Sequence, residues 1–386
     1  MADTVLITGA RSTAALDLAR DFRAIGFRVH LADCSGCMMA RLSSAPHQVH
    51  RYAPPRQAPR QFVRDMTAIV ASVRPHLVVP ACEEIFHLAA PALVPILEGR
   101  LFASPLETLH RLHAKDRFLD LCRGLTLPMP EARRLTDVAD LAVFAGDSAR
   151  WVFKPCYSRF GGRTLVGPDP GLMATVQPSP RDPWLAQRRI DGTEVSFYAT
   201  ARNGALSAFS AYGAGWRLPG GASYAFDPIG GLVAKRLEAY ATGLVRALDL
   251  TGQIACDAIT DRDGRTWLLE CNPRATSGVH LLAGTGGLAR AIVGSTGVHR
   301  AGLDSRHLLP ALVAFGLSEA IRHRRWRDWW RQARSARDVV GRPGDRAPVL
   351  GAVADSLIFS LAARRRGESL RMVTTRDIEW NGEELA

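Results

Sequence analysis

The sequence predicts a protein of mixed α/β and α+β class in several domains. We expect a Rossmann-like α/β domain at the N-terminus, a two-lobed α+β part after it, and a helical extension at the C-terminus. A length of 386 residues is enough for two or three ordinary cores. Strands alternate with helices in the first part of the chain, which is the pattern of a parallel sheet. Two antiparallel hairpins, at 151–167 and 253–271, then indicate a change of architecture.

The N-terminal α/β domain is predicted from short apolar strands separated by a turn and an amphipathic helix. The strands are expected at 4–8, 28–33 and 77–80, and the apolar face of the helix is Ala15, Leu18, Ala19 and Phe22. The turn after the first strand reads G-A-R-S-T-A and lacks the G-x-G-x-x-G of dinucleotide sites, which disfavours NAD.

The middle of the chain is predicted to be richer in antiparallel strands. DRDG and NG are hairpin turns, and Gly161 and Gly162 lie at a hairpin tip that is rich in small and basic residues. Helices are expected at 113–122 and about 233–248, and strands at 151–155, 163–167, 184–190, 194–201, 205–212, 253–260 and 265–271.

Composition excludes several classes of function. The sequence is 47% hydrophobic with a mean hydropathy of −0.02, and no apolar run is long enough to span a membrane. The N-terminus shows no signal-peptide pattern. Seven cysteines, an odd number that is scattered along the chain, suit a reducing compartment, so we expect a cytoplasmic protein.

The net charge of +12 suggests a nucleic-acid partner, but the kind of basic residue argues against one. Of 49 basic residues 46 are Arg, spread over the whole chain, and only three are Lys: Lys115, Lys154 and Lys235. No basic strand carries the aromatic residues that stack on bases, and we predict no nucleic-acid partner. Each remaining Lys is a candidate for a compact charge that the planar Arg fork does not replace.

The hairpin 253–271 is predicted to gather oxygen ligands. Its turn sets a register in which Asp257 lies near Glu270, and alternation places Glu270, Asn272 and Arg274 on one side. Two carboxylates and an amide are hard donors that suit Mg²⁺. The alternative is a carboxylate pair neutralised by Arg274 alone.

The two lysines at the lid hairpin are predicted to contact phosphate. Lys154 ends a strand just before the loop 158–162, and Lys115 lies in the helix that enters the same region. The strand with Gln187 can offer its main chain to an adenine, and Glu194 at the start of the next strand can accept hydrogen bonds from a ribose.

Together these pieces resemble the ATP-grasp superfamily. The residues that carry the resemblance are Lys115, the loop K154-P…S-R-F-G-G, Q187-R-R-I-D-G-T-E194, Asp257 in IACDAI, and E270-C-N-P-R274. Their order matches over roughly residues 1–290, and the sequence looks nearest to the carbamoyl-phosphate-synthetase-like carboxylate–amine (amino acid) ligases. The resemblance implies an N-terminal pre-ATP-grasp α/β domain (1–112), a small lid lobe (113–185), a large lobe with the metal site (186–300) and a C-terminal extension (301–386).

The resemblance also implies roles for these residues. Lys115 and Lys154 would hold the α- and β-phosphates of ATP, and Arg274 together with Lys154 would act on the transferred phosphoryl group. Two Mg²⁺ ions, with Mn²⁺ as a substitute, would bind Asp257, Glu270 and Asn272, although Asp257 is shorter than the Glu or Gln often found there. The rest of the nucleotide site would be Ser158, Gly161 and Gly162 over the γ-phosphate, Gln187 to Ile190 around the adenine, and Glu194 on the ribose.

The function that this implies is an ADP-forming ligase. A carboxylate would be activated as an acyl phosphate with Mg-ATP and then coupled to an amine. The alternatives are a biotin-carboxylase-like enzyme that activates bicarbonate and a nucleotide-binding module without chemistry. The partners would be a small acid and a small amine, and a homodimer is left open. Candidate substrate contacts are Arg217, Ser277, Gly278 and Glu84, with Glu83 beside the last.

Three further features have no predicted role in catalysis. Cys34 and Cys37 form a lone C-x-x-C without the further ligands that zinc needs. His280 is expected to be a packed loop histidine rather than a base. The helix 320–340 carries a tryptophan stripe opposite arginines, and we expect the stripe to pack on the protein core or a second subunit rather than on a bilayer.

Overall fold

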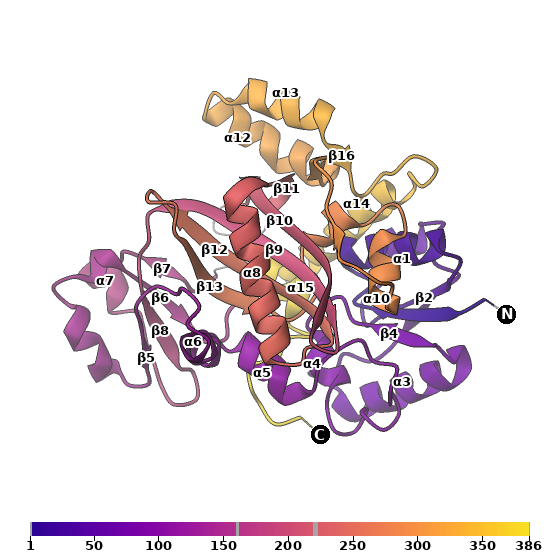
Figure 1. The fold of residues 1–386 in the computed structure, drawn as a ribbon, viewed down its shortest axis with the longest axis horizontal. Helices are drawn as coiled ribbons and strands as arrows, with labels where there is room; N and C mark the ends of the chain where they lie inside the picture. Colours follow the sequence, from indigo (N-terminus) through magenta and orange to yellow (C-terminus); the bar gives the residue numbers. More distant parts are fainter. Residues whose placement is uncertain (1, 160–161, 219–222, 386) are drawn as a thin grey trace.

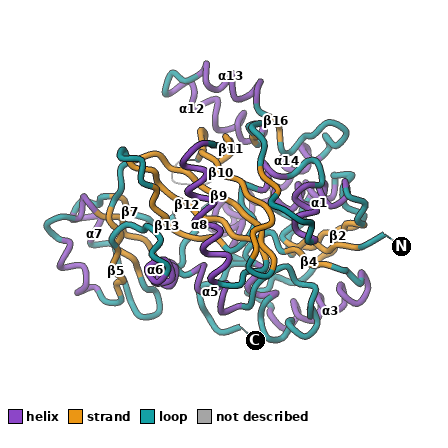
Figure 2. The backbone as a smooth tube through the Cα atoms, viewed as in Figure 1, coloured by secondary structure: helices purple, strands orange, loops and turns teal. Residues whose placement is uncertain are grey.

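The computed structural model describes residues 2–159, 162–218 and 223–385, and three sheets organise them (Figure 1). Figure 2 shows the strands in a band across the molecule, with β5 and β7 at the left, β9, β10 and β12 in the centre, and β2 and β4 at the right. The predicted Gly161 falls outside the described residues.

The first sheet is parallel throughout and has the order β3-β2-β1-β4, which confirms the predicted β-α-β pattern. The predicted apolar face of α1 (Ala15, Leu18, Ala19 and Phe22) is fully buried, and the Ser12 hydroxyl caps the helix by accepting from the Ala15 N–H. The elements are β1 (Thr4–Thr8), α1 (Thr13–Ala24), β2 (Arg28–Asp33), α2 (Met38–Arg41), β3 (Gln48–Arg51), α3 (Pro59–Val73), β4 (Leu77–Val79) and α4 (Glu84–Leu88).

The second sheet is small and antiparallel, with the order β5-β8-β6-β7. The predicted hairpin at 151–167 is present, but its second strand is only Leu165–Val166. The predicted boundary between the two lobes, at 185/186, falls inside β8, which pairs with β6 along its whole length. The elements of this region are α5 (Leu106–His113), α6 (Lys115–Gly124), β5 (Ala132–Leu135), β6 (Trp151–Pro155), β7 (Leu165–Val166), α7 (Pro170–Met173) and β8 (Trp184–Arg188).

The third sheet is the largest, and α8 lies across one of its faces (Figure 1). Leu237, Ala241 and Leu244 of that helix pack against Phe197 and Ile254 of the sheet in one core cluster. The sheet order is β13-β12-β9-β10-β11-β15-β16, with β14 beside β10. The elements are β9 (Gly192–Arg202), β10 (Ala205–Arg217), β11 (Ser223–Pro228), α8 (Gly231–Ala247), β12 (Gly252–Asp261), β13 (Thr266–Asn272), α9 (Val279–Leu282), α10 (Gly287–Val293), β14 (His299–Arg300), β15 (Arg306–His307) and β16 (Arg337–Asp338).

The C-terminal region differs from a purely helical extension, because β15 and β16 join the large sheet. Its helices include α12 (Leu317–Arg322) and α13 (Trp326–Ser335), which project from the body of the molecule, and then α14 (Pro348–Arg366) and α15 (Leu370–Thr375) (Figure 1). Of the tryptophan stripe, Trp329 packs in the cluster around Trp216 and donates to the Leu312 carbonyl. Trp326 and Trp330 are exposed, so the expected packing on the protein core holds for only part of the stripe.

No helix among the described residues is both long and apolar enough to cross a membrane.

Asp17 of α1 contacts two residues that lie far from it in the sequence, His280 and Arg342. Its fully buried carboxylate accepts from Arg342 at 2.7 Å and lies 2.9 Å from Nδ1 of His280. Burial alone would raise the pKa of Asp17, but Arg342 and His280 hold it below its usual value. His280 is therefore a packed histidine, as predicted, and its partner is the carboxylate of Asp17.

Replacing Asp17 with Asn is expected to destabilise the fold by about 3 kcal/mol at neutral pH, because it removes the fully buried charge that pairs with the half-buried Arg342 and with His280. Since the pKa of Asp17 is depressed in the folded state, its stabilisation is present above the usual carboxyl pKa and is lost as the pH falls. The difference between the two proteins in thermal midpoint should therefore shrink on acidification. Asp3→Asn removes an exposed partner of His76 and serves as the control. Equal midpoints for wild type and Asp17→Asn at neutral pH would contradict this account.

Candidate active site

The β12–β13 hairpin places two carboxylates opposite one another. Asp257 pairs with Glu270 across the hairpin, which confirms the predicted register, and Ala255 pairs with Asn272. A bulge lies between the Asp257 pair and the next pair, Ala258 with Leu268. It lets Leu268 enter the core although simple alternation from Glu270 would turn it away.

Both predicted lysines converge on the same carboxylate. Nζ of Lys115 lies 3.4 Å and Nζ of Lys154 3.7 Å from Oε2 of Glu270. Each ammonium also donates to a main-chain carbonyl at 3.2 Å, Lys115 to Ser158 and Lys154 to Leu269. The two side chains are 5% exposed, so their charges face the site rather than bulk solvent.

The charges of this cluster are unequally balanced. Burial and the neighbouring Glu270 raise the pKa of Asp257 to about 6, while the Ser196 hydroxyl donates to its Oδ1 at 2.8 Å. Burial alone would raise the pKa of Glu270 as well, but Lys115 and Lys154 bring it below its usual value. Burial lowers the pKa of Lys154. Of the two carboxylates, Asp257 is thus the one whose negative charge is less well compensated. A bound metal ion would provide the missing positive charge.

Arg274 pairs with a different carboxylate. Its Nη2 donates to Oδ1 of Asn272 at 3.1 Å and lies 3.6 Å from Oε1 of Glu83. Nε of Arg159 donates to the other oxygen of Glu83 at 2.5 Å. Burial alone would raise the pKa of Glu83, but Arg159, His113 and Arg274 lower it to about 2. The alternative in which Arg274 alone neutralises the metal-site carboxylates is therefore wrong.

Arg159, Glu83 and Ser196 also contact the candidate site, and no local sequence pattern singles them out. Arg159 stands in the quoted loop motif between Ser158 and the glycines, and one arginine among 46 carries no distinguishing signal. Glu83 follows the strand 77–80 next to Glu84, and the sequence does not distinguish the two. Ser196 lies opposite Asp257 on β9, a pairing that only the sheet order reveals.

The predicted nucleotide contacts differ in their surroundings. Gln187 on β8 is buried, and its Nε2 has no hydrogen-bond partner among the described residues, which leaves a donor for a ligand. Ile190 is half-buried and Gly162 is exposed. Glu194 is exposed and forms an ion pair with Arg217. The residue predicted to bind the ribose, Glu194, is therefore paired with Arg217, which was predicted to contact the substrate.

The other residues predicted to contact the substrate, Glu84, Ser277 and Gly278, are buried or half-buried. Glu84 is fully buried and accepts from the Thr8 hydroxyl at 2.6 Å and the Ala81 N–H at 3.1 Å, within the N-terminal domain. A side chain at Gly278 would come within 2.3 Å of the Tyr198 Cβ, so this glycine is needed for packing. Ser277, beside it, is half-buried.

The donor set fits Mg²⁺. In the described part of the chain, no three His, Cys, Asp or Glu side chains gather as a self-sufficient metal site. Asp257, Glu270 and Asn272 offer two carboxylates and an amide, which suits an ion that completes its shell with water and phosphate oxygens. Burial raises the pKa values of the Cys34 and Cys37 thiols, which disfavours the thiolate form that metals bind.

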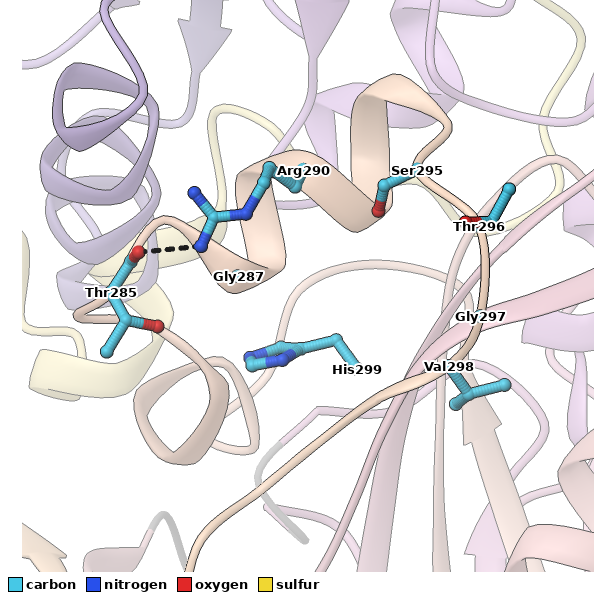
Figure 3. A pocket seen from close by; sticks show the side chains of 8 residues that line it. All are labelled: Thr285, Gly287, Arg290, Ser295, Thr296, Gly297, Val298 and His299. Carbon is cyan, nitrogen blue, oxygen red and sulfur yellow. Dashed lines mark hydrogen bonds between the residues drawn. The ribbon is translucent and has the colours of Figure 1, made fainter.

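The molecule has a hollow that the predicted site residues do not line. It has a volume of about 430 Å³ and lies beside α10 (Figure 3). Arg290 closes one side of it by donating to the Thr285 carbonyl at 2.9 Å. None of the predicted site residues lines it.

No protein-family model and no curated protein matches the sequence. Several solved structures, in contrast, superpose on the fold of this chain. An N5-carboxyaminoimidazole ribonucleotide synthetase in complex with ADP superposes with a TM-score of 0.61 at 15% identity, over 79% of this chain and 80% of that one. An L-amino acid ligase from Bacillus licheniformis gives 0.56 at 17%, over 73% and 70%. The biotin carboxylase domain of Hydrogenobacter thermophilus 2-oxoglutarate carboxylase, with MgADP and bicarbonate, gives 0.60 at 11%, over 76% and 70%.

The chain thus has the ATP-grasp fold, as its motifs predicted. Within that fold it is similar to ligases and carboxylases that act on different substrates, and identities of 11 to 17% establish shared architecture only.

We expect Lys154→Ala to weaken ADP binding in the presence of Mg²⁺ by roughly 10- to 100-fold, because a buried charged donor is worth about 1.5–3 kcal/mol. The change is measured by titration with a fluorescent ADP analogue. Lys235→Ala is the matched control, since Lys235 is exposed on α8. Unchanged affinity in Lys154→Ala would remove this lysine from the nucleotide site.

Proposed function

We propose that the protein is an ADP-forming ligase that couples a carboxylate to an amine. The observation that carries the proposal is the convergence of two buried lysines on Glu270, opposite Asp257. Buried charges of this number are costly unless a ligand uses them. A polyphosphate with its Mg²⁺ is complementary to the positive and the negative groups of the site. The phosphate pairs with the lysines and the cation with the carboxylates.

The residues divide into those that bind nucleotide and those that hold the metal. Lys115 and Lys154 bind phosphate oxygens. Nε2 of Gln187, which has no hydrogen-bond partner in the described part of the chain, lies on the strand proposed to face adenine. Asp257, Glu270 and Asn272 hold Mg²⁺, which neutralises phosphate charge when it is bound. The lobe assignments and the use of Mn²⁺ in place of Mg²⁺ belong to the same proposal.

The chemistry follows in two steps. A carboxylate oxygen of the acid attacks the γ-phosphorus, and the bond from that phosphorus to the bridging oxygen breaks to release ADP. Arg274, held between Asn272 and Glu83, stabilises charge on the phosphoryl group during this transfer. The amine nitrogen then attacks the acyl carbon, loses a proton, and inorganic phosphate leaves with the electrons of the carbon–oxygen bond. Most of the catalysis is positioning and charge neutralisation.

One specific observation favours a second candidate function. Similar structures include a biotin carboxylase domain with bicarbonate and several N5-carboxyaminoimidazole synthetases. A reaction in which bicarbonate is the acid uses the same nucleotide and metal residues, so the two candidates differ only in the acid that attacks.

The two candidates are separated by phosphate release from ATP in the presence of pools of small acids and amines, with and without bicarbonate. The proposal predicts ADP formation that needs both an acid and an amine. Dependence on bicarbonate would favour the second candidate, and binding of ATP without turnover in any mixture would contradict both.

Glu270→Gln is expected to reduce turnover by at least about 100-fold while the protein stays folded, because the change removes a ligand charge that also orders both lysines. Steady-state rates and a thermal melt give the two readouts. Glu238→Gln is the control, since Glu238 is paired with Arg300 on the surface of α8. A near-normal rate for Glu270→Gln would exclude Glu270 from the metal site.

A further inference from the structure

The segment 377–383, which we call the C-terminal strap, follows α15 and contacts Arg11, in the turn after β1. Asp377 accepts from both terminal nitrogens of Arg11, at 2.7 and 2.9 Å, and Ile378 is buried in the N-terminal core. Trp380 is 3% exposed, with its ring centroid 4.9 Å from that of Phe86. These contacts fix the strap at both its start and its middle.

The strap holds the side chain of Arg159. Nη2 of Arg159 donates to the Trp380 carbonyl at 2.6 Å, and Nη1 donates to Oδ1 of Asn381 at 2.7 Å. The remaining nitrogen, Nε, is the one that donates to Glu83. All three guanidinium nitrogens are therefore engaged, which fixes the plane of a side chain that otherwise has many rotamers.

Two short paths connect Arg159 with the proposed catalytic groups. Glu83 bridges Arg159 and Arg274, and Arg274 in turn donates to the proposed metal ligand Asn272. In the other path the carbonyl of the preceding residue, Ser158, accepts from Lys115, whose ammonium contacts Glu270. The first path consists of contacts between side chains, and the second passes through the main chain at Ser158. All the residues involved are buried or half-buried.

We propose that the C-terminal strap is a positioning element of the active site: Trp380 and Asn381 orient Arg159, and Arg159 sets the positions of Glu83, Arg274 and Lys115. This inference rests on the proposed function for its kinetic consequence, but the physical link between strap and nucleotide site does not depend on which acid or amine reacts. The strap residues touch neither the nucleotide nor the metal in this proposal.

The link is tested without activity by hydrogen exchange of the peptide that covers the strap. In wild type we expect Mg-ADP to slow this exchange by at least about tenfold, because a bound nucleotide orders Lys115 and Arg274. Arg159→Ala should speed the exchange and abolish its response to Mg-ADP. Arg163→Ala is the control, since Arg163 is on the same hairpin but pairs with the exposed Asp182. Strap exchange that is the same in Arg159→Ala and wild type would overturn the proposal.

The kinetic consequence is tested with Asn381→Ala, which deletes one acceptor and leaves the buried Trp380 in place. We expect kcat to fall roughly tenfold, because a misplaced Arg274 affects the transfer step. The affinity for Mg-ADP should fall as well, because Arg159 also positions Lys115 and the coupling between strap and nucleotide is reciprocal. In an Arg274→Lys background the same substitution should have almost no further effect. An equal fall in both backgrounds would show a merely structural role and contradict the inference.

The outcomes also separate this inference from the proposed function. Failure of Mg-ADP to bind wild type would contradict the proposed function, while faster strap exchange in Arg159→Ala would still support the contact network. Mg-ADP binding that leaves the strap unaffected would overturn the inference and leave the proposed function standing.

Discussion

The site depends on the need to balance two carboxylates that one hairpin places side by side. Asp257 and Glu270 are direct partners across the β12–β13 ladder, so neither can move away from the other without breaking the sheet. Two like unit charges about 4 Å apart repel one another by about 4 kcal/mol at the effective dielectric constant near a protein surface. The two lysines offset this for Glu270, and the pKa of Asp257 near 6 shows that its charge is only partly compensated. The bare site is thus adapted to a cation beside the carboxylates and an anion beside the lysines.

The N-terminal sheet contributes to the candidate active site through its carboxyl edge. Arg11 pairs there with Asp33 at the end of β2 and with Asp377 of the C-terminal strap, so the chain itself covers the place where open α/β sheets usually bind ligands. Glu83, from the loop after β4, reaches Arg274 instead. The end of the chain therefore packs against its beginning and joins the N-terminal sheet to the candidate active site.

Much of this could be predicted from local pattern. Alternation and turn chemistry were enough to pair Asp257 with Glu270, and the scarcity of lysine was enough to select Lys115 and Lys154. The bulge that admits Leu268 to the core was not predictable, because it depends on how the hairpin packs against α8. The role of Arg159 could not be read either, since its partners Glu83, Trp380 and Asn381 lie far from it in sequence. Long-range contacts of a common residue type leave no local signal.

The most direct test of this account is a crystal structure with Mg-ADP. The account predicts the metal about 2.1 Å from carboxylate oxygens of Asp257 and Glu270, with the Lys154 ammonium within hydrogen-bond distance of a phosphate oxygen. A nucleotide bound elsewhere, or a metal without contact to either carboxylate, would contradict it.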